Sequence, residues 1–332
     1  MNRTIQAVTA MATLAVTAAA TAQSSVTLYG RADVSIDHVS IKSPTGSKSL
    51  TAMSNDGSRW GVRGSEDLGG GLKANFNLEN GFAIDNGSIT QGGVFFGRTA
   101  WVGLSSASLG AVQLGRNNIP LDDLAWEYDS FYAAGVGALW ALQPYAARVN
   151  NSIKYISPTL GKVQFRGLVS TAEGVAGVGG EQFGVSAQYR DKPFDLALAH
   201  TIVKDPTLTL SERKETYLGG ALKFNGPRIV ASIFQRNDKG AAKLSTTNIG
   251  GNLPLGGGDL RVSFTKASQG VESTNQASVG YWYPLSKRTF VHGAVSQQKN
   301  SANRNGALNP SFAAKANGDD VTAMQIGLRH NF

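Results

Sequence analysis

The stretch Val26-Thr-Leu-Tyr-Gly-Arg-Ala-Asp-Val-Ser-Ile-Asp37 alternates between two kinds of side chain. Apolar or small residues stand at every even position, and polar or amphipathic residues, such as Arg31, stand at the odd ones. Successive side chains of a β-strand point to opposite faces, so this alternation predicts a strand with one apolar and one polar face. The stretch is also longer than the roughly 5–6 residues of a typical globular strand and matches a strand that crosses a bilayer at a tilt.

The same alternation returns along the chain, in residues 72–79, 163–170, 183–190 and 324–332. Seven short connections rich in Gly, Pro, Asp or Ser separate such stretches: 66–70, 106–110, 157–161, 191–193, 225–227, 254–258 and 284–288. Longer polar segments lie between them, at 42–57, 171–181, 203–214 and 299–319. Seven short turns, together with a junction of the two termini, give eight hairpins. This pattern predicts an all-β fold, a 16-stranded antiparallel transmembrane β-barrel whose short and long connections alternate.

The first residues have the organisation of a secretory signal. Arg3 is followed by an uncharged apolar stretch from Ile5 to Ala19 and then by the small-residue site Ala20-Thr21-Ala22. About 15 apolar residues are too few to span the roughly 30 Å core of a bilayer. We therefore expect a cleaved signal peptide at 1–22 and a mature barrel domain at 23–332.

Composition argues against several other functions. The chain has 31 Lys and Arg against 23 Asp and Glu, a net charge of +8, but these charges are interleaved along the strands and form no single basic patch, so no nucleic-acid partner is expected. Cysteine is absent, and the four histidines stand in no nucleophile or metal-ligand motif: His38, His200, His292 and His330. We predict no enzyme activity, no metal site and no cofactor.

Several sequence blocks carry a family resemblance. They are Ser25–Gly30, Ser58–Ala74, Phe96–Leu104, Leu114–Arg116, Arg148–Pro158 and Gly327–Phe332. In this order they resemble the general porins of Gram-negative bacteria over the whole mature chain. The resemblance implies an outer-membrane homotrimer, surrounded by membrane lipid and lipopolysaccharide, that forms a water-filled pore for passive diffusion of small hydrophilic solutes and ions. It also implies that the third external loop folds inward and narrows the pore.

That constriction loop maps to Asn117–Ala147, which combines acidic, aromatic and apolar residues. The family sets basic side chains on the barrel wall against acids on this loop. Matching the motifs places the basic ladder on six arginines: Arg59, Arg63, Arg98 and Arg148, with Arg31 and Arg116 as neighbours. Arg59 and Arg63 are four residues apart and share a strand face, and on the lipid face near the midplane each would cost about 2–4 kcal/mol. The alternative is a set of arginines at the rims of the barrel with no role in selection.

The acidic partners come from the same loop. The resemblance favours Asp123 and Asp129 at the constriction, with Asp122 and Glu127 as further candidates; helix capping or solvated loop charge is the alternative. An excess of wall arginines over loop acids suggests a weak preference for anions. A solute-specific channel is the alternative function, since four loop aromatics could line the constriction: Trp126, Tyr128, Phe131 and Tyr132.

Overall fold

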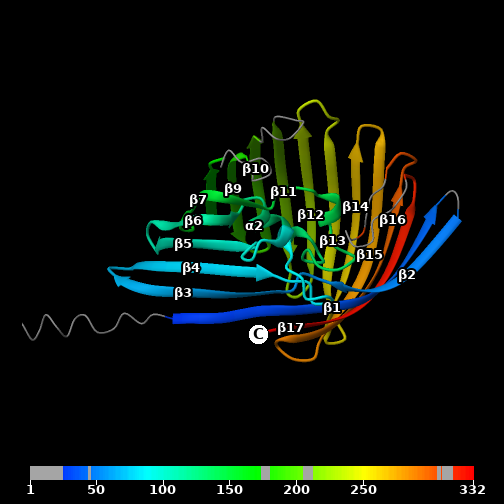
Figure 1. Ribbon diagram of the computed structural model, residues 1–332, viewed down its shortest axis with the longest axis horizontal. Coiled ribbons are helices and arrows are strands. Elements are labelled where there is room, and N and C mark those ends of the chain that lie inside the picture. Colours follow the sequence, from blue (N-terminus) through cyan, green and yellow to red (C-terminus); the bar gives the residue numbers. More distant parts are fainter. Residues whose placement is uncertain (1–24, 44–45, 173–179, 205–211, 305–307, 309–316) are drawn as a thin grey trace, which may run out of the picture.

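The computed structural model describes residues 25–43, 46–172, 180–204, 212–304, 308 and 317–332. Within these residues the strands form one antiparallel sheet that closes where β17 pairs with β1 (Figure 1). In chain order they are β1 (Ser25–Ser43), β2 (Gly46–Asn55), β3 (Arg59–Gly69), β4 (Leu72–Gly81), β5 (Thr99–Ser106), β6 (Gly110–Asn118), β7 (Arg148–Ile156), β8 (Val163–Ser170), β9 (Glu181–Asp191), β10 (Phe194–Lys204), β11 (Arg213–Lys223), β12 (Arg228–Asp238), β13 (Leu244–Leu255), β14 (Gly258–Gln269), β15 (Glu272–Pro284), β16 (Thr289–Asn300) and β17 (Asp320–Asn331). The predicted signal peptide lies outside the described residues.

The seventeen strands of the described residues occupy sixteen strand positions around the barrel. The long strand β1 pairs with β2 through residues 34–43 and with β3 through residues 25–31. β2 and β3 therefore occupy one strand position of the barrel, which is interrupted at residues 56–58. Counting this pair once confirms the predicted 16-stranded antiparallel β-barrel.

All seven predicted short turns connect strands at one end of the barrel. The other end differs from the prediction in two ways. Most of the predicted long segment 42–57 is hairpin strand, because β2 continues the ladder with β1. The connection between β14 and β15 is only Gly270 and Val271, so short and long connections do not alternate strictly. The predicted long segments 171–181, 203–214 and 299–319 lie partly outside the described residues.

The period-two pattern sorts side chains between the outside and the inside of the barrel. On β1, Ile36 is 51% exposed whereas Asp33 on the opposite face is completely buried. On β17, Ile326 is 60% exposed and Gln325 beside it is buried. The apolar face therefore points outward and the polar face inward, which suits a wall between lipid and water. Among the described residues no helix is long and apolar enough to cross a membrane.

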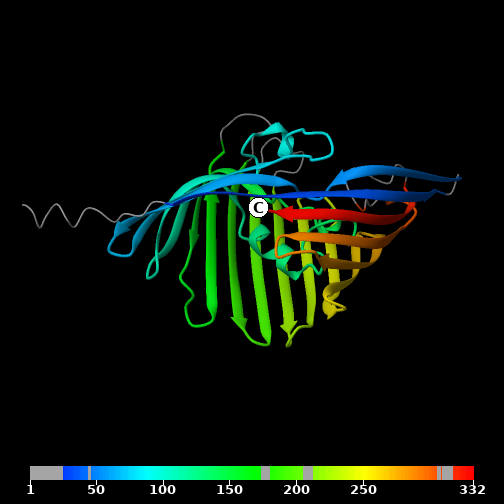
Figure 2. The same ribbon diagram turned by 90° about the horizontal axis from the view of Figure 1, so that it is seen from below.

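One connection turns into the barrel. Residues 119–147 join β6 to β7 and contain the short helices α2 (Asp122–Ala125), η2 (Trp126–Tyr128) and η3 (Trp140–Leu142); a further helical turn, η1 (Gln91–Gly93), lies between β4 and β5. Figures 1 and 2 show α2 and its neighbours against the inner side of the green and yellow strands. We call residues 119–147 the inward loop.

Candidate functional site in the barrel lumen

The inward loop is held on the barrel wall by two apolar clusters. In the first, residues from Ile119 to Leu142 of the loop pack on inward side chains of β10 to β14, such as Tyr217 and Phe234. In the second, Phe131, Val136 and Ala138 pack on β15, β16, β17 and β1. The predicted loop began at Asn117, but Asn117 and Asn118 belong to β6. Burial of a large apolar side chain contributes about 1.5–3 kcal/mol, so these clusters hold the loop firmly against one wall.

Glycines on the wall make room for the loop's aromatic rings. A Cβ added at Gly219 of β11 would lie 2.5 Å from the ring of Tyr128. A Cβ added at Gly280 of β15 would lie 2.9 Å from the ring of Phe131. Both rings are completely buried, and the Tyr128 hydroxyl donates to Asp195 on β10 at 2.6 Å. The inner wall is therefore shaped to receive these two aromatic anchors.

Hydrogen bonds from the wall to the loop backbone complete this attachment. The side chains of Asn252, Thr246 and Gln276 donate to the carbonyls of Ser130 (2.9 Å), Leu142 (2.6 Å) and Ala138 (3.3 Å). Because such bonds satisfy loop backbone groups that the apolar clusters have removed from water, they fix the path of the loop as well as its position.

Asp129 does not line the pore, contrary to the prediction. It is 2% exposed, and its carboxylate accepts the backbone N–H groups of Phe131 (2.8 Å), Ala133 (3.0 Å) and Leu139 (3.1 Å). Burial raises the pKa of Asp129, while these backbone donors oppose the rise. Asp129 thus organises the turn that follows η2, which is the capping alternative considered from the sequence.

The other three loop acids meet basic side chains of the wall. Asp123 lies 2.5 Å from Nζ of Lys154 and 3.7 Å from Nε of Arg166. Glu127 forms an ion pair with Arg190 of β9. Lys154, Arg166 and Arg190 were not among the predicted site residues. Their strand parity could have identified them, because each alternates with outward apolar residues.

Asp122 reaches the predicted ladder. Its Oδ2 lies 3.9 Å from an Nη atom of Arg148 at the start of β7. Burial raises the pKa of Asp122, and the Arg148 guanidinium counteracts this. Arg116 of β6 lies within electrostatic range of Arg148 and donates to Asn150 at 2.5 Å and to the carbonyl of Gly97 at 2.8 Å. Two of the six predicted arginines therefore sit beside the beginning and the end of the inward loop.

Four further arginines form a cluster beside these two, because its member Arg98 lies within electrostatic range of Arg148. Arg31 of β1 stands directly opposite Arg59 of β3 in the strand register. Both lie within electrostatic range of Arg98, just before β5, and of Arg329 on β17. Arg98 is paired with Glu79 at 2.5 Å and Arg329 with Asp33 at 2.6 Å. We call Arg31, Arg59, Arg98 and Arg329 the arginine cluster; Arg329 was not predicted.

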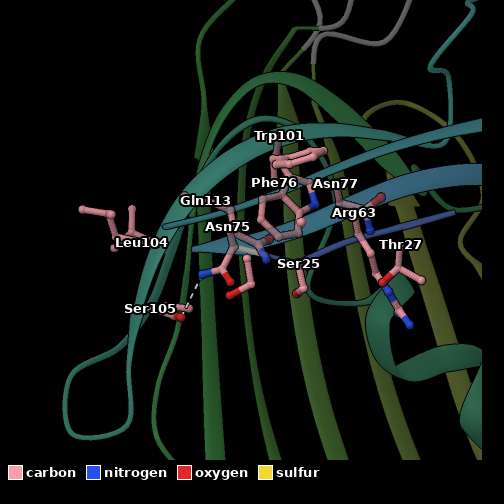
Figure 3. A pocket seen from close by; sticks show the side chains of 15 residues that line it. Ser25, Thr27, Arg63, Asn75, Phe76, Asn77, Trp101, Leu104, Ser105 and Gln113 are labelled. Atoms are coloured by element: carbon pink, nitrogen blue, oxygen red, sulfur yellow. Dashed lines mark hydrogen bonds between the residues drawn. The ribbon is translucent and has the colours of Figure 1, made fainter. Parts of the chain in front are cut away.

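Arg63 lies away from this cluster. It shares the inward face of β3 with Arg59, but four residues of strand separate the two by about 13 Å. Its guanidinium stacks on Tyr29, 4.9 Å from the ring centroid. It borders a groove of about 430 Å³ toward the short-turn end, with Asn75, Asn77 and Gln113 on the neighbouring strands (Figure 3).

One histidine meets two aspartates, which the sequence did not suggest. Ligand-type atoms of Asp33, Asp56 and His292 all lie within 4.8 Å of one another. The Asp33 carboxylate is already in contact with Arg329 at 2.6 Å and with Nε2 of His292 at 3.1 Å. These residues come from β1, β16, β17 and the interruption between β2 and β3, so only barrel closure brings them together.

The aromatic lining proposed as an alternative is not formed. Tyr128 and Phe131 are completely buried against the wall and cannot meet a passing solute. The Tyr132 ring is occupied by the guanidinium groups of Arg228 and Arg261, each about 5 Å from its centroid. Trp126, 46% exposed, is the one ring of the four that is largely accessible. A single ring does not make a continuous apolar track.

The lumen thus offers a polar passage crossed by opposed charges. Acids reach it from the inward loop and arginines from the facing wall. Rings of charged side chains and the width of a constriction are the features that select ions in a channel. A pore of this kind acts by transmitting and sorting solutes.

Comparison with known proteins agrees with this geometry. A family model described as Gram-negative porin matches residues 7–303. The outer membrane porin protein 32 of Delftia acidovorans is 31% identical, over 97% of this chain and 98% of the relative. The solved anion-selective porin from Comamonas acidovorans superposes with a TM-score of 0.82 and 30% identity, over 93% of this chain and all of that one. The trimer form of OmpT from Vibrio cholerae shares the fold, with a TM-score of 0.69 and 13% identity, over 93% of this chain and 99% of that one. The chain belongs to the Gram-negative porin family.

Proposed function

We propose that this porin is a general diffusion channel with a weak preference for anions, narrowed by the inward loop. As a member of its family it lies in the bacterial outer membrane and passes solutes passively. The observation that carries the proposed selectivity is the charge balance at the arginine cluster. Four arginines gather there, and the acids in direct contact with them are Glu79 and Asp33.

Three of the four loop acids do not offset this excess, and the fourth, Asp122, contacts Arg148 and lies within electrostatic range of Arg98. Asp123 and Glu127 are engaged by Lys154, Arg166 and Arg190 on another part of the wall. Asp129 is buried inside the loop. Field lines concentrate in a passage lined by one sign of charge, so uncompensated arginines raise the local concentration of anions. The transverse field between Asp122 on the loop and the facing arginines would also orient dipolar solutes.

Liposome swelling tests whether the channel is general. With the purified protein in the vesicle wall, uncharged sugars should enter at rates that fall smoothly with molecular size and rise linearly with concentration. This is expected because the inward loop presents no continuous aromatic track that would bind one solute. Entry that saturates for one sugar and excludes another of equal size would support a solute-specific channel instead.

We further propose a homotrimer of chains that begin at Gln23. The barrel provides an apolar outer wall on β1 and β17, where Val26, Leu28 and Leu328 are each more than 45% exposed. The Ala20-Thr21-Ala22 site supplies the expected cleavage point. Native mass spectrometry of gently extracted protein should give three copies of a 310-residue chain. A monomer alone would contradict the assembly, and a retained Met1 would contradict the processing.

A further inference from the structure

We infer that the outer surface of β14 to β16 binds a phosphate group of a glycolipid in the outer leaflet, through Lys266 and Lys299. This inference rests on the outer-membrane location and goes beyond channel function. It starts from the strand register, which places Lys266 opposite Asn275, and Asn275 opposite Lys299. These three strands are neighbours in the yellow and orange part of the wall (Figure 1). We call Lys266, Asn275 and Lys299 the lysine row.

The row points away from the lumen. On β14, Thr265 and Ala267 on either side of Lys266 are completely buried, whereas Lys266 itself is exposed. On β16, Gln298 is completely buried beside an exposed Lys299. The ammonium groups therefore lie on the face that carries the exposed apolar side chains of the barrel.

Successive rows on this face change from apolar to polar. The row Val262, Val279 and Val295 is exposed and apolar, and it is followed toward the long-loop end by Phe264, Ala277 and Gln297. The lysine row comes next, and Ser268 paired with Ser273 follows it. A lysine on the lipid face costs about 2–4 kcal/mol near the midplane and about 0–1 kcal/mol near an interface. The lysine row thus stands at the boundary between hydrocarbon and headgroups.

The geometry of the row suits one anionic group. Neighbouring strands are about 4.8 Å apart, so Lys266 and Lys299 are separated by about 10 Å with Asn275 between them. Both long side chains can converge above Asn275, whose amide adds a third donor. Within the described residues, neither lysine has an acidic group within 4.0 Å.

The charges beside the row leave it positive. Asp320 of β17 is the acid nearest to Lys299 in the strand register, because it comes directly after the pair Gln298 and Val321. Its Oδ1 accepts the backbone N–H of Asn300 at 3.2 Å. Asp320 stands opposite Lys42 of β1 in the strand register. Three lysines and one aspartate therefore face the headgroup region here. A phosphate on a membrane-anchored glycolipid has the charge and the depth to meet them.

The test compares the full-length barrel with the double variant Lys266→Gln/Lys299→Gln. Binding is measured for diphosphorylated lipid A and for its fully dephosphorylated form in the same detergent. Each lysine near an anionic surface contributes about a fivefold preference, so the double variant should bind diphosphorylated lipid A about thirtyfold more weakly. Its binding of the dephosphorylated lipid should not change. Lys266→Arg/Lys299→Arg should retain wild-type binding within about threefold.

Lys214→Gln is the matched control. Lys214 is an exposed lysine of β11 whose charge is already paired with Glu212 at 3.1 Å. Its replacement should change lipid binding by less than twofold. Single-channel conductance should stay at the wild-type value in every variant, because these lysines lie outside the lumen, so loss of lipid binding is separable from failure of the channel.

Three results would overturn the inference. The double variant could bind diphosphorylated lipid A as tightly as the wild type. Inorganic phosphate at about 10 mM could displace the lipid completely, which would indicate a simple anion site. Native mass spectrometry could show that the double variant loses its oligomeric state, which would mean that a second copy of the chain covers this face.

Discussion

Removing the two aromatic anchors of the inward loop should widen the pore. In Tyr128→Ala/Phe131→Ala, two completely buried rings are lost from the seat between the loop and β11, β12 and β15. Truncation of a buried aromatic residue costs about 3–5 kcal/mol, so the packing of the loop on the wall would lose roughly 6–10 kcal/mol of stabilisation. The loop should then leave the wall while the hydrogen-bonded barrel persists. We expect single-channel conductance to rise severalfold, with larger current fluctuations.

Tyr128→Phe is the control for this experiment. It keeps the ring in the space above Gly219 and removes two hydrogen bonds of the hydroxyl, one donated to Asp195 and one accepted from Gln188, each worth about 1 kcal/mol. Its conductance should stay near the wild-type value. Strand content by circular dichroism should be equal in all three proteins. An alanine variant with intact strands, a protease-accessible loop and unchanged conductance would show that the loop does not limit the pore.

Neutralising part of the arginine cluster should shift selectivity toward cations. Arg31→Gln/Arg59→Gln is the informative variant, because neither side chain has an acidic group within 4.0 Å in the described structure. Replacing Arg98 or Arg329 would instead remove the arginine that is in direct contact with Glu79 or Asp33. A charge about 5 Å from a monovalent ion is worth about 0.8 kcal/mol in water, roughly a fourfold change in local concentration. The anion-to-cation permeability ratio should therefore fall severalfold.

Arg63→Gln is the matched control for position. It removes the same charge from the same face of β3, about 13 Å farther along the strand. At 0.1 M salt the Debye length is about 10 Å, so this substitution should have a much smaller effect on reversal potential. An equal effect of Arg63→Gln and Arg59→Gln would place selection at the mouth of the pore instead of at the arginine cluster.

The period-two pattern and the spacing of the short turns predicted the barrel, because each strand fixes its own two faces and each short turn joins two neighbouring strands. Alternation from Val26 to Asp37 assigned Asp33 to the inside and Ile36 to the outside, as found. It could not reveal that β2 continues the ladder of β1, because the segment 42–57 is mostly polar, contains Pro44 and Gly46, and shows no sustained apolar alternation around Leu50 and Met53. The strand there forms because β2 pairs with β1, and such a contact between two strands is not visible in the pattern of one segment.

The site was harder to predict than the wall. Arg59 and Arg98 could be placed by motif, because each stands at the start of a regular strand whose register with its neighbours fixes where the side chain points. The acids could not, because Asp123 and Asp129 are six residues apart on an irregular loop whose path depends on distant wall glycines such as Gly219. Asp129 is held inside the loop by three backbone N–H donors, and no sequence spacing predicts these contacts. The inward loop is thus specified by shape complementarity across the lumen.

The reversal potential of the unmodified channel across a tenfold salt gradient tests the central claim most directly. With potassium chloride at 0.01 M and 0.1 M, its sign reports whether chloride or potassium crosses more readily past the arginine cluster. We expect a potential of the sign set by chloride, which shrinks when both solutions are made ten times more concentrated, because the Debye lengths on the two sides then fall from about 30 and 10 Å to about 10 and 3 Å. A potential set by potassium at low salt would contradict the assignment of the arginine cluster as the selective element.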